Sequence, residues 1–240
     1  MKEKGFIRQQ TWKRLADLGL SPSVSHSIPP FRGQEQAAER LRGLEPYVKA
    51  RRVFVPPDSA QFEVRLNVLR DGKALVMATP RLRDGFYVAD QGIPQHLWAR
   101  GVSSFGIRRW GRKAATNKDD IGEIDLLVTG AVAVSLQGDR IGKGTGYFDW
   151  EYAILREISS IGAETPVVAV VHDLQVYGEL PSQEKDVSVD FIVTPTQVIA
   201  AESPRPRPSG IDWHQLNGRT IAAMRPLREL TRARRTRLGR

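Results

Sequence analysis

The stretch "IDLLVTGAVAVSLQGDRIGKGTGYFDWEYAILREI", residues 124–158, holds an apolar run, a glycine-rich loop and a second apolar pattern, in that order. The first run has about the length of a pair of strands and is interrupted by Gly130. In the second pattern, apolar residues recur with a helical period, at positions 150, 154, 158 and 161. The stretch therefore predicts a glycine-rich loop that joins a strand to a helix.

Similar alternation extends to both sides of this unit. Short apolar runs of strand character lie at residues 51–55, 73–79, 166–172 and 189–199. Windows with a helical pattern lie at residues 2–18, 34–44 and 60–71. Because strands that alternate with helices pair in parallel and are covered on both faces, we predict a three-layer, Rossmann-like α/β domain with a mixed, mainly parallel sheet.

Two regions lack such periodicity. Residues 80–118 are punctuated by Pro, Gly and Arg, and we interpret them as a long functional or flexible connection. Near the other end, "AESPRPRPSG" marks a Pro-rich exit from the core. We expect one α/β domain over residues 1–200 and a Pro-rich and Arg-rich extension over residues 201–240.

Charge and composition limit the possible functions. The chain has 240 residues and a net charge of +9, and seven arginines against the single Glu229 fall within residues 225–240. Such a run is typical of a solvated tail, and the alternative is weak contact with nucleic acid. The absence of cysteine excludes disulfides and thiolate metal sites. No apolar stretch approaches the length of a membrane span, so we expect a soluble, cytoplasmic protein.

The glycine-rich loop favours an anion site. Glycines ahead of a helix leave backbone N–H groups open to phosphate oxygens, because no Cβ stands in the way. The loop matches neither the Walker A spacing nor the dinucleotide fingerprint, since Gly144 follows Lys143 and Tyr147 stands where a third glycine belongs. From these residues alone, a tight surface turn remains the alternative.

The order of residues within the loop adds a resemblance. "RIGKGTGYFD", residues 140–149, resembles the R-x-G-x-G-x-G-Y-Y-D signature of the 5-formyltetrahydrofolate cyclo-ligase family, also called 5,10-methenyltetrahydrofolate synthetases. Lys4 and Arg8 are similar to the K-x-x-x-R of that family's first helix, a spacing that puts both cations on one face. The chain is still more similar to a divergent branch, the methenyltetrahydrofolate synthetase domain-containing proteins. It departs from the classical pattern at Phe148, which replaces a tyrosine, and over residues 80–118.

The resemblance implies ATP and Mg²⁺ as cofactors and a reduced, formylated folate as the small-molecule substrate. It implies phosphate contacts for one set of residues: Lys4, Arg8, Gly142, Gly144, Thr145 and Gly146. It implies catalytic roles for Arg140, Lys143 and Tyr147, of which Tyr147 either contacts substrate or packs under the loop. It also makes Asp149 the candidate magnesium ligand, against the alternative of an acidic residue favoured at a helix N-terminus.

Three functions follow as hypotheses. The first is an ATP- and magnesium-dependent ligase that converts 5-formyltetrahydrofolate to 5,10-methenyltetrahydrofolate. The second is a cyclo-ligase-like protein that binds nucleotide or folate without that turnover, because members of the divergent branch need not keep the activity. The third is an RNA-associated protein that uses the arginine-rich end.

Overall fold

The computed structural model describes residues 2–22, 25–214 and 216–238. Its helices are α1 (Lys2–Asp17), α2 (Gln34–Arg42), α3 (Glu45–Lys49), α4 (Phe62–Arg70), α5 (Trp98–Gly101), α6 (Ile107–Trp110), α7 (Lys118–Ile121), α8 (Tyr147–Glu157), α9 (Gly218–Ala223) and α10 (Arg225–Leu238). Its strands are β1 (Arg52–Phe54), β2 (Ala74–Ala78), β3 (Phe86–Ala89), β4 (Arg112–Lys113), β5 (Leu126–Thr129), β6 (Ala133–Ser135), β7 (Arg140–Ile141), β8 (Val167–Val170), β9 (Val176–Tyr177), β10 (Phe191–Val193) and β11 (Val198–Ala200). None of the helices in these ranges is long and apolar enough to cross a membrane.

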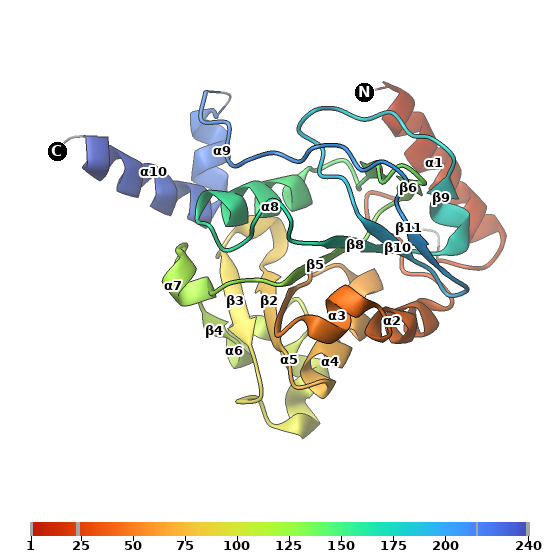
Figure 1. Ribbon diagram of the computed structural model, residues 1–240, viewed down its shortest axis with the longest axis horizontal. Coiled ribbons are helices and arrows are strands. Elements are labelled where there is room, and N and C mark those ends of the chain that lie inside the picture. The colour runs from red at the N-terminus through yellow and green to blue at the C-terminus, as the bar shows by residue number, and fades with distance from the viewer. Residues whose placement is uncertain (1, 23–24, 215, 239–240) are drawn as a thin grey trace.

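Eight strands form one mixed sheet in the order β11-β10-β8-β5-β1-β2-β3-β4. The five central strands run parallel, with Val53 of β1 in register with Leu75 on one side and Leu126 on the other. The pairs at the two ends of the sheet are antiparallel. Figure 1 shows α2, α3 and α4 on one face of this sheet and α8 on the other.

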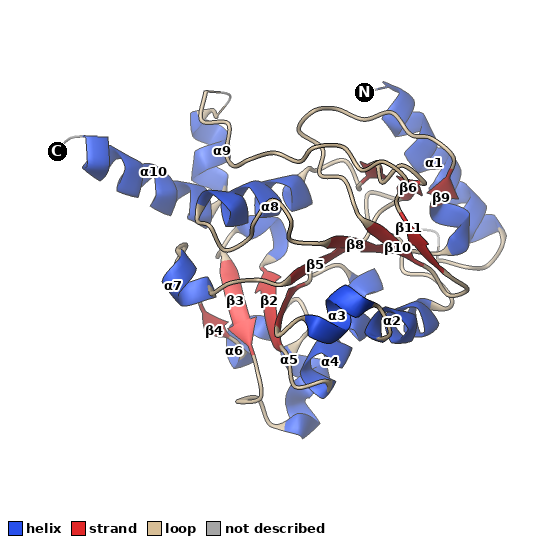
Figure 2. Cartoon of the chain, viewed as in Figure 1, coloured by secondary structure: helices blue, strands red, loops and turns tan. Residues whose placement is uncertain are grey.

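Each face of the sheet buries its own hydrophobic core. Val53 and Val55 pack with Leu41 of α2 and Val64 of α4, whereas Phe54 packs on the opposite face with residues of α8. Successive side chains of a strand point to opposite faces, so a strand covered on both sides needs an unbroken apolar run. This explains why "RVFV" and "LLV" read as continuous rather than alternating patterns. The predicted three-layer α/β fold is confirmed (Figure 2).

A second, three-stranded sheet carries the first helix. Its order is β7-β6-β9, with β6 antiparallel to β7 and parallel to β9. Ile7 of α1 packs on a small cluster around Ile141 and Leu180, and the hydroxyls of Thr11 and Tyr177 lie 2.7 Å apart. These contacts hold α1 beside the end of β7, where the glycine-rich loop begins.

The interpretation of residues 80–118 as a long connection is wrong. They contain β3 and β4, which extend the sheet by two antiparallel strands, and the short helices α5 and α6. All four residues of β3 are buried, because the strand lies between β2 and β4. The Pro and Gly residues mark turns between very short elements, and elements of two to four residues are too short to show a period.

The expectation of a solvated arginine tail is wrong for its first part. Leu227 of α10 is 0% exposed and Met224, just before it, is 5% exposed, and both belong to the core around α8. Glu229 accepts hydrogen bonds from Thr116 N and Oγ1 at 3.1 and 2.6 Å. The far part of α10 extends away from the body of the molecule and exposes arginines 232, 234 and 235 (Figure 1). Weak contact of these arginines with nucleic acid stays a prediction.

Candidate functional site

A cavity of about 1600 Å³ opens at the carboxyl ends of two neighbouring parallel strands. Five residues after or at the ends of these strands line the cavity: Pro56, Pro57 and Asp58 after β1, Thr129 at the end of β5 and Gly130 after it. From β1 the chain continues through α4 to β2 on one side, whereas from β5 it reaches β8 on the other side. Such a reversal of strand order leaves a crevice between the outgoing loops, and ligands of open α/β sheets bind there.

The glycine-rich loop, residues 142–146, forms one wall of this cavity. It connects β7 to α8, and it turns through Gly144 at φ +100° and Gly146 at φ +68°. Gly146 is the residue before α8, and no side chain there caps the first-turn N–H groups of the helix. Unpaired amides at the N-terminus of a helix attract anions, because the helix dipole adds positive potential.

The structure brings together four cations predicted from the sequence, and each of them has an acceptor within the protein. Arg8 Nε donates to the Gly142 carbonyl oxygen at 2.7 Å, and Lys4 pairs with Asp186. Burial lowers the pKa of Arg8, and the nearby charge of Asp186 opposes that shift. The two cations of α1 therefore contact different segments: Arg8 contacts the glycine-rich loop, and Lys4 contacts the segment that holds Asp186.

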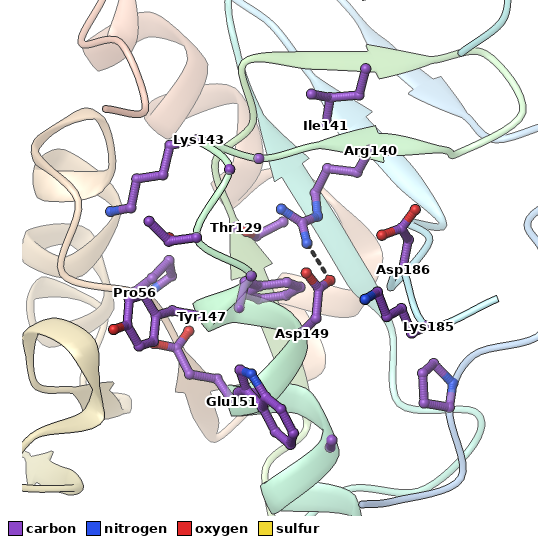
Figure 3. Close-up of a pocket in the computed structure, with 18 of the residues that line it drawn as sticks. Pro56, Thr129, Arg140, Ile141, Lys143, Tyr147, Asp149, Glu151, Lys185 and Asp186 are labelled. Atoms are coloured by element: carbon purple, nitrogen blue, oxygen red, sulfur yellow. Dashed lines mark hydrogen bonds and ion pairs between the residues drawn. The ribbon is translucent and has the colours of Figure 1, made fainter. Parts of the chain in front are cut away.

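The other two cations come from β7 and from the loop itself. Arg140 Nη2 lies 2.6 Å from Asp149 Oδ1 (Figure 3). The guanidinium carbon of Arg140 lies 4.6 Å from the centre of the Phe148 ring. Lys143 Nζ lies 2.6 Å from Asp58 Oδ1. An anion that binds at the loop therefore meets cations whose positions are already set by ion pairs.

Tyr147 and Asp149 both line the cavity from the first turn of α8. Tyr147 also packs against the α8 core, and its contact with substrate stays a prediction. Asp149 Oδ1 accepts from Arg140 and from Val187 N at 3.2 Å. The described residues contain no group of three His, Cys, Asp or Glu side chains able to hold a metal ion. Mg²⁺ bound with a nucleotide needs only one or two carboxylates, because phosphates and water complete its shell, and Asp149 fits that need.

Sequence reasoning missed Asp58 and the residue that holds its loop. Asp58 follows the apolar run 51–55 after two prolines, and this position just beyond a predicted strand could have marked it as a candidate site residue. Arg65 of α4 gave no such signal. It is 1% exposed, and it donates to the carbonyl oxygens of Val102, Pro56 and Asp58 at 2.8, 2.6 and 2.9 Å. Burial lowers the pKa of Arg65 to about 10, so its side chain stays charged at neutral pH.

Glu151 was also missed. It lies on the second turn of α8, lines the cavity and is 3% exposed, and its Oε2 has no hydrogen-bond partner among the described residues. Burial is the main cause that raises the pKa of Glu151; the charges of Asp58 and Asp149 add to the shift, and those of Lys143 and Arg140 oppose it. In a helical pattern an acidic residue is expected on the exposed face, so nothing in the sequence indicates that Glu151 is buried.

Comparison with known proteins agrees with this geometry. A family model described as the 5-formyltetrahydrofolate cyclo-ligase family matches residues 1–195. The chain belongs to this family. A methenyltetrahydrofolate synthase domain-containing protein of Homo sapiens is 37% identical over 245 residues, which cover 98% of this chain and 63% of that protein. The Bos taurus protein of the same name is 36% identical over 236 residues, or 95% of this chain and 61% of that one.

The chain thus spans less than two thirds of the length of these curated relatives of the cyclo-ligase family. The structure of a 5,10-methenyltetrahydrofolate synthetase from Aquifex aeolicus is similar to this one, with a TM-score of 0.54 and 20% sequence identity. The match covers 89% of this chain and 99% of the Aquifex aeolicus chain. At that identity the likeness concerns the fold. The predicted family and its divergent branch are both confirmed.

Proposed function

We propose that this cyclo-ligase family member converts 5-formyltetrahydrofolate to 5,10-methenyltetrahydrofolate with consumption of ATP. One observation carries the proposal: four cations, two from α1 and two from β7 and the loop after it, meet at the glycine-rich loop beside the large cavity; they are Lys4, Arg8, Arg140 and Lys143. A site that gathers cations around open helix amides suits a polyphosphate, and the rest of the cavity has room for a second substrate.

In the proposed reaction the formyl oxygen takes the γ-phosphoryl group of ATP, and ADP leaves. N10 of the folate then attacks the formyl carbon, loses its proton, and closes the ring as inorganic phosphate departs. Little covalent chemistry falls to the protein, so its contribution is to orient the substrates and to neutralise charge on the phosphoryl oxygens. In this proposal Arg140 and Lys143 neutralise charge, and the backbone amides of the glycine-rich loop orient the phosphates; the ion pairs of both cations and the position of the loop at the cavity support these roles.

Asp149 is the residue that would hold magnesium. Magnesium there would neutralise part of the charge on the phosphate oxygens. Arg140 keeps the Asp149 carboxylate in place through their ion pair. Tyr147, on the same turn of α8, contributes an aromatic wall to the cavity.

The deciding experiment measures the absorbance of methenyltetrahydrofolate formed from 5-formyltetrahydrofolate, with and without ATP. Product that depends on ATP supports the proposal. Nucleotide binding without product would favour the alternative, a family member that keeps the binding site and lacks turnover.

Replacing Arg8 with Ala should weaken ATP binding by about tenfold or more, because a charge-assisted hydrogen bond to phosphate contributes on the order of 1.5–3 kcal/mol. Arg8 also donates to the loop at Gly142, so its loss affects both the charge and the shape of the site. Nucleotide titration of the Arg8→Ala protein measures the effect. Arg14→Ala is the matched control, because Arg14 lies on the same helix with an exposed side chain. Equal affinities of the two variants for ATP would mean that α1 packs on the small sheet without contributing to nucleotide binding.

A further inference from the structure

Three acidic residues lie around the same part of the cavity, and one of them differs from the others. Asp58 is paired with Lys143, and Asp149 is paired with Arg140. Glu151 lies near all four of these charged groups, yet its Oε2 has no partner in the described part of the chain. The two cations within reach thus already have carboxylate partners, which leaves the buried acid without one.

Burying a polar oxygen without a hydrogen bond costs free energy, so such groups are rare in folded proteins and call for a reason. A bound ligand that donates a hydrogen bond to this oxygen would be such a reason. Figure 3 shows the Glu151 side chain extending from α8 toward Pro56, across the cavity from the ion pair of Arg140 and Asp149. Its carboxyl group therefore lies in the wall of the cavity, on the side away from this ion pair.

The surroundings of Glu151 suit a flat ring. Tyr147 and Trp150 of α8 and Pro56 after β1 line the same cavity and offer apolar surfaces. Glu151 lies five residues after Gly146, about 7.5 Å along the helix axis at 1.5 Å per residue. Phosphates held at the helix N-terminus thus leave the carboxyl group free for another part of the bound substrates.

We propose that Glu151 determines specificity by accepting hydrogen bonds from the amino-pyrimidinone edge of the folate ring. This inference rests on the proposed function, which makes a reduced folate the second substrate. The exocyclic amino group and the adjacent ring N–H donate in parallel, one to each oxygen of the ionised Glu151 carboxyl group. These two hydrogen bonds favour the ionised form, which burial alone disfavours. Glu151 touches the substrate in this arrangement and takes no part in phosphoryl transfer.

The test compares two ligands on two proteins. Binding of 5-formyltetrahydrofolate and of its 2-desamino analogue is measured by calorimetry, in the presence of a non-hydrolysable ATP analogue. The parent should bind the natural compound about tenfold or more tightly than the analogue. Glu151→Gln should reduce that preference to less than about threefold, because an amide presents only one acceptor oxygen, and should leave affinity for the ATP analogue unchanged. Glu164→Gln, an exposed position after α8, should behave as the parent.

The outcomes separate this inference from the proposed function. Equal binding of both compounds by the parent protein overturns the role of Glu151 whether or not the variant folds, which a thermal melt checks. The same preference in the parent and in Glu151→Gln also overturns it. If the parent forms product from 5-formyltetrahydrofolate in either case, the proposed function stands and the specificity role alone falls. If the parent binds no folate and forms no product, both fall.

Discussion

Arg65→Met is expected to lower the free energy of unfolding by about 3 kcal/mol, because three carbonyl oxygens, two of them in buried hydrogen bonds, lose their charged donor at once. The loss of a buried charge offsets part of this cost, and methionine fills most of the space. Urea unfolding followed by circular dichroism measures the change.

Arg70→Met is the control for this substitution, because Arg70 lies at the end of the same helix, α4, with an exposed side chain. It should change stability by less than about 0.5 kcal/mol. Arg65 also holds the loop that carries Asp58, and Asp58 positions Lys143. If the two variants unfold at the same urea concentration, Arg65 does not hold the 56–58 loop in solution.

Leu227→Ala should destabilise the protein by about 2–5 kcal/mol, which is the range for a buried leucine replaced by alanine. Leu227 is fully buried against the core around α8, although it stands in the most basic part of the chain. The measurement is a thermal or urea melt beside the parent.

Removal of residues 232–240 is the matched comparison for Leu227→Ala, because the described side chains of that segment, 232–236, are exposed. This truncation should leave stability within about 0.5 kcal/mol of the parent. A truncated protein that melts as early as Leu227→Ala would mean that the exposed arginines also dock the extension.

The sequence by itself determined the strands of the parallel sheet and the helices that cover it. Runs such as 51–55 and 166–172 are apolar throughout because both of their faces are buried, and that property is written in consecutive residues. The glycine-rich loop was equally readable, because glycine adopts the positive φ found at positions 144 and 146 more readily than any other residue. The cations Lys4 and Arg8 were found through the family resemblance, and the structure places both against the loop and its neighbouring segment.

Only the tertiary structure decided which side chains meet. The pairing of Asp58 with Lys143 joins residues 85 positions apart, and no local pattern encodes such a partner. Arg65 and Leu227 are buried by surfaces that distant segments supply. From the sequence alone Arg65 has no distinguishing feature, and Leu227 falls within a run that is typical of a solvated tail. The unpartnered oxygen of Glu151 is of the same kind, since the lack of a partner is a property of everything packed around it. Local periodicity reports whether a residue is buried, whereas the identity of its neighbours is set by chain topology.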